Sequence, residues 1–352
     1  EDLVVAESAQ TGFRKSYGEL VQCLRARVPA AMRVHLTQTP YDDTVTLPPS
    51  APKMSGWGAV NQRGCNTGLA LMAGFVQLKA IEDGMPSVNW YSPLQRYLVK
   101  RREGDPYYML NDWDRVHPKA LAHSIMAWTF LLAQGAPAVV SDVAVDATDC
   151  SITKADNATV SNVGRSKGGL SFDVTAGALP YPVESSSLEA VAEFDVESRL
   201  NRERLAVVGL EAGTYVLRID GNDVGSYTAG ALASGVLLGF NDRTPQYRQA
   251  RQVFERTADL SARERSIRDC SVVRMVFKGR KAPVDDIKAF ASWFEKNAKD
   301  KSGYFESMVP RYLECWPKRD EIRKRMLEEQ SEIRKLAKPV MHRYEVLACA
   351  GH

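Results

Sequence analysis

The chain has 352 residues, a length that suits two or three domains with buried cores of their own. Hydrophobic residues make up 44% and aromatic residues 9%, which excludes a disordered or low-complexity chain. Lysine and arginine number 46 against 43 aspartates and glutamates, so the charge balance predicts no nucleic-acid partner. The longest apolar runs, 125–133 and 229–240, fall short of the roughly 20 residues of a membrane helix, so we expect no membrane span.

The first 137 residues predict alternating helices and strands. Apolar residues recur at helical spacing over 13–28 and 64–84. Short apolar segments at 32–39 and 86–90 are typical of strands. A further helix is expected over 118–135, because proline suits a first helical turn and glycine a helix end. This alternation indicates an α/β domain with a parallel sheet.

The remaining chain divides by its texture into two further parts. After residue 137, short apolar segments alternate with glycine, asparagine and serine, which predicts a small β-rich module. A helical period with charged faces follows. We therefore expect an α/β domain over 1–137, a β-rich module over 138–240 and a helical C-terminal region over 241–352.

The six cysteines are scattered singly, without a CxxC pair or a histidine at ligand spacing. A structural metal site is therefore not expected. Their even number permits disulfides without requiring them.

The most informative motif is Asn-Asp-Trp-Asp-Arg-Val-His-Pro at 111–118. Asp114 precedes His117 by three residues on a predicted loop before a helix. At this spacing the carboxylate can accept the Nδ1 proton of the imidazole and leave Nε2 to take a proton from a hydroxyl. The alternative interpretation of so short a motif is a solvated loop with a helix-capping histidine.

The segment 114–118, followed by Ala122, His123 and an apolar helix, resembles the last conserved block of the SGNH (GDSL-type) hydrolases. Residues 13–43 are similar to this family as well, with an amphipathic helix and a strand that ends in Thr-Pro-Tyr-Asp-Asp. The resemblance covers about residues 1–137. It implies a three-layer α/β/α, flavodoxin-like domain, of which this chain holds a part.

The resemblance also implies roles for two residues. His117 would be the general base and then the general acid of a Ser–His–Asp triad, and Asp114 its orienting carboxylate. No metal or organic cofactor would be needed. The family's Gly-Asp-Ser nucleophile and Gly-x-Asn-Asp oxyanion motifs do not occur before Asp114. We therefore expect the chain to be the C-terminal part of a longer protein, inactive on esters by itself.

Two other motifs are interpreted as turns. Gly221, Asn222 and Asp223 echo the oxyanion motif, but they follow the histidine block and suit a hairpin turn. Residues 164–168 fit the G-x-S-x-G nucleophile elbow with Ser166 as nucleophile. The elbow requires a helix after the serine, whereas the next residues alternate like a strand, so a hairpin is the better interpretation.

Four further residues have either a site or a structural interpretation. Asp42 and Asp43 follow a predicted strand, where ligands of open α/β sheets bind, so they are candidates for the rim of the site. The alternative is that they start a turn or cap a helix. His123 is interpreted as a packed or hydrogen-bonded structural histidine, and His35 as an outward residue of a strand.

The sequence thus predicts an SGNH-type serine ester hydrolase that acts on a small-molecule or carbohydrate ester. The first alternative is a non-catalytic, hydrolase-like protein whose β-rich and helical parts bind a glycan or another protein. The second alternative is an α/β-hydrolase that uses Ser166.

Overall fold

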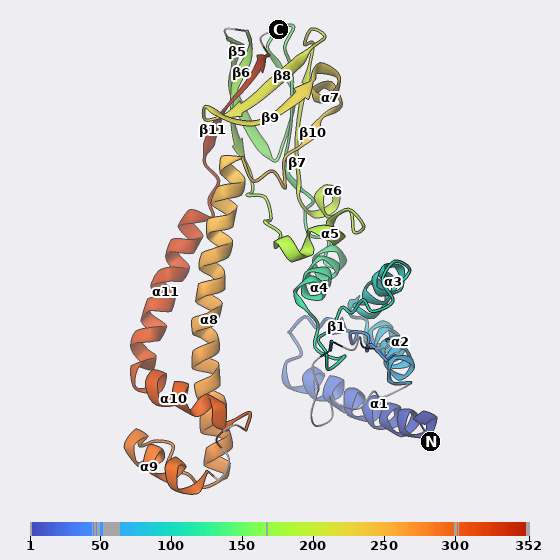
Figure 1. Ribbon diagram of the computed structural model, residues 1–352, viewed down its shortest axis with the longest axis vertical. Helices are drawn as coiled ribbons and strands as arrows, with labels where there is room; N and C mark the ends of the chain where they lie inside the picture. The colour runs from blue at the N-terminus through green and yellow to red at the C-terminus, as the bar shows by residue number, and fades with distance from the viewer. Residues whose placement is uncertain are drawn as a thin grey trace. The chain divides into compact units, whose positions relative to one another are not determined.

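The computed structural model describes residues 2–43, 45, 47, 50, 51, 64–166, 168–298, 301 and 303–349. The chain is a mixed α/β protein that folds as two units (Figure 1). The first unit runs to Val139 and includes Val183–Asn201. The second unit holds Val140–Pro182 and the chain from Arg202 onward.

The first unit combines helices with a short parallel sheet. Its elements are α1 (Asp2–Arg27), β1 (His35–Leu36), α2 (Cys65–Asp83), β2 (Ser87–Val88), α3 (Tyr91–Arg102), α4 (Ala120–Ala133), α5 (Leu188–Val191) and α6 (Val196–Leu200). Strands β1 and β2 pair in parallel, with His35 opposite Ser87. The helices and strands predicted from the periodicity of this region are present, and α3 is an additional helix.

The core of the first unit centres on α4. Ile125 and Trp128 of this helix are almost completely buried, at 1% and 0% exposure. The ring of Trp128 lies 6.0 Å from that of Phe194, which belongs to the segment between α5 and α6. This contact shows why residues 183–201 join the first unit although β-strands precede and follow them in the chain.

The second unit contains two β-sheets. Its strands and the short helix among them are β3 (Val139–Asp146), β4 (Ser151–Asp156), β5 (Ala158–Ser166), β6 (Gly169–Ala176), β7 (Arg202–Val208), β8 (Thr214–Ile219), β9 (Asn222–Thr228), α7 (Ala229–Ser234), β10 (Val236–Leu237) and β11 (Met341–Ala348). One sheet has the order β10-β7-β3-β4 and the other β5-β6-β11-β8-β9. Alternate residues of both sheets enter one apolar core, as in a β-sandwich.

Strand β11 lies in the region expected to be wholly helical. It pairs antiparallel with β6 and with β8, placing Tyr344 opposite Phe172 on one side and Ile219 on the other. Tyr344 and Val346 point into the sandwich core. The helical region over 241–352 therefore ends in a strand that completes the sheet of the preceding module, because only long-range pairing buries its apolar face.

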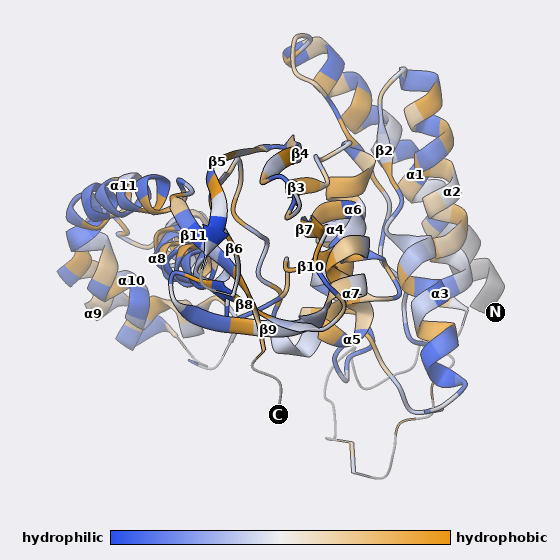
Figure 2. Ribbon diagram, turned by 90° about the horizontal axis from the view of Figure 1, so that it is seen from above, coloured by the Kyte–Doolittle hydropathy of each residue, from blue (hydrophilic) through white to orange (hydrophobic). Residues whose placement is uncertain are grey.

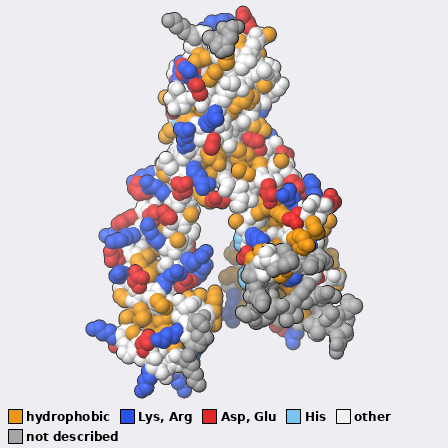
Figure 3. Space-filling model, in the orientation of Figure 1, with side chains coloured by type: hydrophobic (Ala, Val, Ile, Leu, Met, Phe, Trp, Pro, Cys, Tyr) orange, Lys and Arg blue, Asp and Glu red, His pale blue; other side chains and the backbone are white. Residues whose placement is uncertain are grey.

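The helical arm of the second unit consists of α8 (Pro245–Gly279), α9 (Ile287–Asn297), α10 (Val309–Cys315) and α11 (Arg319–Leu336). At 1.5 Å per residue, the 35 residues of α8 span about 52 Å. Helix α11 packs along α8, and an ion pair joins Arg263 to Glu329. Figure 2 shows that α11 is mostly hydrophilic, and Figure 3 shows acidic and basic side chains mixed along the arm.

A buried polar contact connects the start of α8 to the sandwich. Nε2 of Gln246 donates to Oε1 of Glu203 on β7 at 2.6 Å and to the hydroxyl of Tyr344 on β11 at 2.9 Å. In the described part of the chain, no helix combines the length and apolar character that crossing a membrane requires.

Candidate functional site

The loop over 111–118 is a tight turn that leads into α4. The N–H of Asp112 donates to the carbonyl of His117 at 2.8 Å, which closes the base of the loop. Arg115 has a φ of +69°, in the left-handed region that side chains other than glycine rarely adopt. Its N–H reaches the carbonyl of Asp112 at 2.8 Å, so the unusual φ completes the turn.

Asp114 and His117 contact each other across this turn. Oδ2 of Asp114 accepts a hydrogen bond from Nδ1–H of His117. Oδ1 of Asp114 accepts the backbone N–H groups of Val116 and His117, both at 3.0 Å. The contact expected between the two side chains is therefore present, and Nε2 is the ring nitrogen left to exchange a proton with a ligand.

The two side chains differ in exposure, at 68% for His117 and 17% for Asp114. Burial alone would raise the pKa of the Asp114 carboxyl. The hydrogen bonds from the His117 ring and from two backbone N–H groups outweigh burial and hold this pKa below its usual value. Asp114 is consequently an anion at neutral pH, which makes it a strong acceptor for the imidazole N–H.

Asp42 lies beneath the loop and is completely buried. Its Oδ1 is 2.8 Å from the guanidinium of Arg102, and its Oδ2 accepts the N–H of Asn111 at 3.4 Å. Burial raises the pKa of Asp42, and the nearby Arg102 and the Asn111 N–H offset only part of this effect. Asp42 is therefore inside the protein rather than at the rim of a site, because the chain after β1 passes under the loop.

Arg115 turns inward toward the same segment. It is only 7% exposed, and its guanidinium donates to the carbonyls of Asp42 and Val45 at 2.6 and 2.9 Å. The side chain of Asn111 donates to the carbonyls of Pro40 and Arg115 at 3.0 and 2.9 Å. These bonds hold the loop against the segment that follows β1 and so fix its position and orientation.

Asp43 binds the start of α2. Its Oδ2 accepts the backbone N–H of Asn66 at 3.1 Å, one of the N–H groups that the first turn of a helix leaves unpaired. In return, Oδ1 of Asn66 accepts the N–H of Tyr41 at 3.0 Å. Asp43 thus fits the alternative interpretation of a helix-capping residue.

A pocket of about 300 Å³ opens next to the loop. Its lining comes from the segment after β1, from the first turns of α2 and from the residue before His117, and consists of Gln38, Thr39, Pro40, Tyr41, Cys65, Leu69 and Val116. Oε1 of Gln38 is buried and has no hydrogen-bond partner among the described residues. Since a buried acceptor without a donor is costly, a ligand hydroxyl or N–H would be stabilised at this atom.

Both motifs interpreted as turns are hairpins. Ser166 ends β5 and pairs with Gly169 of β6, so the chain runs strand–turn–strand where a nucleophile elbow needs strand–turn–helix. Asp220 and Gly221 have positive φ values of 51° and 77° between β8 and β9, as a two-residue hairpin turn requires.

The interpretations of two other histidines were wrong. His35 is buried, with Nε2 at 3.2 Å from Asp83 and Nδ1 at 2.9 Å from the hydroxyl of Tyr17. Polar groups of α1 and α2 satisfy both ring nitrogens, so the strand turns His35 inward and Leu36 outward. His123 is exposed on α4, because it lies on the outer side of a helix whose other side carries the buried Ile125.

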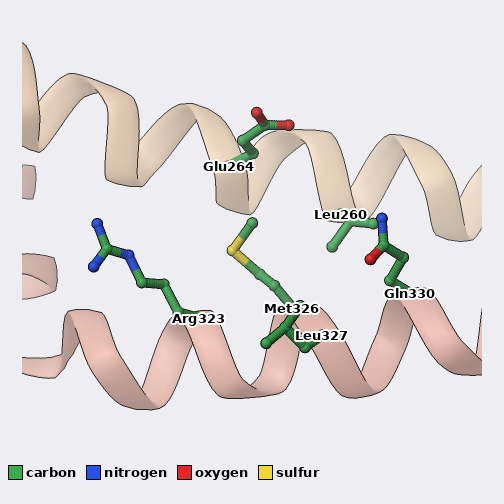
Figure 4. A pocket seen from close by; sticks show the side chains of 6 residues that line it. All are labelled: Leu260, Glu264, Arg323, Met326, Leu327 and Gln330. Carbon is green, nitrogen blue, oxygen red and sulfur yellow. The ribbon is translucent and has the colours of Figure 1, made fainter.

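A second groove, of about 430 Å³, lies between α8 and α11 (Figure 4). Its lining consists of Leu260, Glu264, Arg323, Met326, Leu327 and Gln330. Met326 projects from α11 toward α8, and no nucleophile or histidine is among the lining residues. The groove therefore lacks the histidine and the hydroxyl or thiol that triad chemistry needs. Among the described residues, no three His, Cys, Asp or Glu side chains group to hold a metal ion.

Sequence reasoning missed the residues that support the loop. Arg102, Asn111 and Arg115 act through contacts with the segment after β1, and no local pattern signals such contacts. Gln38 and Cys65 were also missed as pocket residues, since they meet only when α2 packs beside β1.

The fold of the chain, with its α/β unit, β-sandwich and helical arm, is shared with a known enzyme structure. Neither a protein-family model nor a curated protein sequence matches the chain. A solved structure of a gut microbial diltiazem-metabolizing enzyme is similar to it, with a TM-score of 0.85 and 24% identity. The similarity covers 98% of this chain and 78% of that chain. At this identity the likeness shows the fold.

Proposed function

We propose that this chain holds the acid–base pair of an SGNH-type serine ester hydrolase, with Asp114 and His117 as two of the three triad residues. The observation that carries the proposal is the hydrogen bond from Nδ1–H of His117 to Asp114, with the imidazole otherwise exposed and the preceding residue, Val116, lining a pocket. The parallel strands β1 and β2, which pack with α2, support a three-layer α/β/α arrangement for the first unit.

The proposed reaction is acyl transfer to water through an acyl-enzyme. Nε2 of His117 takes the proton of a serine hydroxyl as its oxygen attacks the ester carbonyl, and then gives this proton to the leaving alcohol. In the second half, the same nitrogen takes a proton from water, which attacks the acyl-enzyme and releases the acid. The Asp114 anion keeps hydrogen on Nδ1 and stabilises the imidazolium that forms in each half. This chemistry needs no metal or organic cofactor.

The proposed substrate is a small-molecule or carbohydrate ester. A pocket of about 300 Å³ with Leu69 and Val116 in its walls suits a short acyl chain, and the buried oxygen of Gln38 suits a neighbouring hydroxyl. The solved neighbour is named for metabolizing diltiazem, an ester-bearing drug, which is compatible with ester hydrolysis on this fold.

The test is a comparison of variants in the protein expressed from its complete coding sequence, with p-nitrophenyl acetate as substrate. His117→Ala should lower kcat/KM by roughly 10²- to 10⁴-fold, because it removes the general base. Asp114→Asn should lower kcat within the same range while the fold is retained, since an amide can donate to Nδ1 and so favour the wrong tautomer.

Two matched controls separate this proposal from its alternatives. His123→Ala removes an exposed histidine six residues away and should leave kcat/KM unchanged. Ser166→Ala should also leave it unchanged, because Ser166 lies in a hairpin. Full activity in His117→Ala would contradict the proposal. Absence of ester hydrolysis in the wild type itself would favour the alternative of a non-catalytic protein that binds a glycan or another protein. Loss of activity in Ser166→Ala alone would favour the α/β-hydrolase alternative.

A further inference from the structure

Two cysteines lie where α10 packs against α8 at the tip of the helical arm. Cys270 of α8 is completely buried in the apolar cluster that α8, α9 and α10 share. Cys315, the last residue of α10, is partly exposed and packs against the same cluster. Each thiol therefore faces one apolar core from a different helix.

Two contacts between the helices bracket this pair of cysteines. The first is the ion pair of Asp269 with Arg311 at 2.7 Å. Asp269 directly precedes Cys270 on α8, and Arg311 lies one turn before Cys315 on α10. In the second, the Arg274 guanidinium lies 4.3 Å from the ring centroid of Trp316. Arg274 lies one turn after Cys270, and Trp316 directly follows Cys315. The two thiols are thus held between fixed points on both helices.

Both thiols are weaker acids than an ordinary cysteine, chiefly because they are buried. Burial, then the neighbouring Cys315 and then Asp269 raise the pKa of the Cys270 thiol to about 11. Burial and then Glu314 raise the pKa of Cys315 as well. Because both thiols stay protonated at neutral pH, their oxidation is expected to be slow there.

We propose that Cys270 and Cys315 are a disulfide-forming pair that fastens α10 to α8 when the protein meets an oxidising thiol–disulfide couple. This inference does not depend on the proposed hydrolase activity, since all of its residues belong to the second unit.

The reaction uses a small disulfide such as oxidised glutathione. The partly exposed Cys315 loses its proton to solvent, and its sulfur attacks the glutathione disulfide, so that a mixed disulfide forms and one glutathione thiol leaves. Cys270 then loses its proton and attacks the sulfur of Cys315, which releases the second glutathione thiol. Two protein thiols become one disulfide, and one oxidised glutathione becomes two reduced molecules.

The disulfide would close the loop that contains α9 and most of α10. A cross-link over such a loop restricts the unfolded chain and raises the temperature of unfolding. The cross-link would also stop α10 from separating from α8, which makes the tip of the arm more resistant to unfolding in an oxidising compartment.

The experiment incubates the purified chain with oxidised glutathione at about pH 8.5, where more thiolate is present than at neutral pH. Free thiols are counted in denaturant, and the alkylated protein is mapped by mass spectrometry without reduction. We expect two of the six thiols to disappear and the peptides of Cys270 and Cys315 to be linked. The unfolding temperature should rise by about 5 °C or more, and a reducing agent should reverse the change.

Two variants accompany the wild-type measurement. Cys315→Ala should lose the cross-link and the shift in unfolding temperature, whereas Cys150→Ala, which changes a partly buried cysteine of the β-sandwich, should keep both. Retention of all six thiols in the oxidised wild-type chain would overturn the proposal. A cross-link that maps to other cysteines would overturn it equally, and neither result depends on a variant folding.

Discussion

Replacing Glu203 by glutamine should remove a pH-dependent loss of stability from the β-sandwich. Glu203 is 2% exposed on β7, and its Oε1 accepts the hydrogen bond from Gln246 at 2.6 Å. Its Oε2 is buried without a partner among the described residues. Burial raises the pKa of Glu203 to about 7, although the bond from Gln246 acts in the opposite direction. The folded protein therefore keeps a proton on this carboxyl in mildly acidic solution.

The size of the effect follows from the difference between the folded and unfolded states. A glutamate in an unfolded chain titrates near about pH 4.3, so between there and about pH 7 only the folded state holds the proton. Raising the pH through this window lowers the free energy of unfolding by about 1.4 kcal/mol per unit, or roughly 3 to 4 kcal/mol in all. Below the window both states are protonated, and above it both are ionised, so the loss begins and ends there.

The assay is urea unfolding of the wild type and of Glu203→Gln, followed by circular dichroism from about pH 4 to about pH 8. Glutamine has nearly the same shape and no titratable proton, so the difference in free energy of unfolding should shift by roughly 3 to 4 kcal/mol in favour of the variant across this range. Glu211→Gln, at an exposed position of the β7–β8 turn, is the control and should show a constant difference. A constant difference for Glu203→Gln as well would refute the reasoning that burial holds a proton on this carboxyl.

Two further predictions concern the first unit. Arg115→Ala should lower the free energy of unfolding by about 3 kcal/mol in thermal or urea unfolding, because the carbonyls of Asp42 and Val45 lose their charged donor; a loss below about 0.5 kcal/mol would contradict this account. Alkylation of Cys65 by iodoacetamide should be slow at neutral pH and speed up with rising pH, because burial and then Asp43 raise the pKa of its thiol. Asp43→Asn should make the neutral-pH reaction faster, and an unchanged rate would show that the carboxylate has no influence.

The contact between Asp114 and His117 was predictable because it is local. Three residues separate the two side chains, so one turn brings them together whatever the rest of the chain does. The support beneath the turn was not predictable in this way. Arg102 and Asp42 are 60 residues apart. Arg115 is buried, whereas arginine is usually exposed, so its residue type predicts the opposite of its observed burial.

The elements with strong periodicity were predicted, and those without it were not. Helices α2 and α4 follow a helical period, and β1 and β2 follow short apolar segments. Strand β4 is almost entirely exposed and β5 has no fully buried residue, so neither shows the clear alternation of buried and exposed positions by which a half-buried strand is recognised. They exist because β4 pairs with β3 and β5 with β6, and pairing leaves no mark in the strand's own composition.

Strand β11 shows a different reason for a missed element. Tyr344 and Val346 alternate with polar residues, so the signal for a strand was present in the sequence. The long charged helices before it made a helical interpretation of the whole region attractive. Only the pairing of Tyr344 with Phe172 gives this strand its place, and a register over such a distance depends on the folded sandwich.

Asp42 and Asp114 show how environment gives two carboxylates near one loop different roles. Asp42 is completely buried, and burial raises its pKa in spite of the adjacent Arg102, so its contribution is to hold the loop in place. Asp114 is less buried, and the three N–H groups that it accepts outweigh the effect of burial and keep its pKa low. It therefore remains an anion in contact with the exposed imidazole of His117. A change at Asp42 should therefore lower stability together with activity, whereas a change at Asp114 should lower activity in a protein that unfolds at nearly the same temperature. Measuring both quantities for both variants separates a residue that positions the loop from one that takes part in proton transfer.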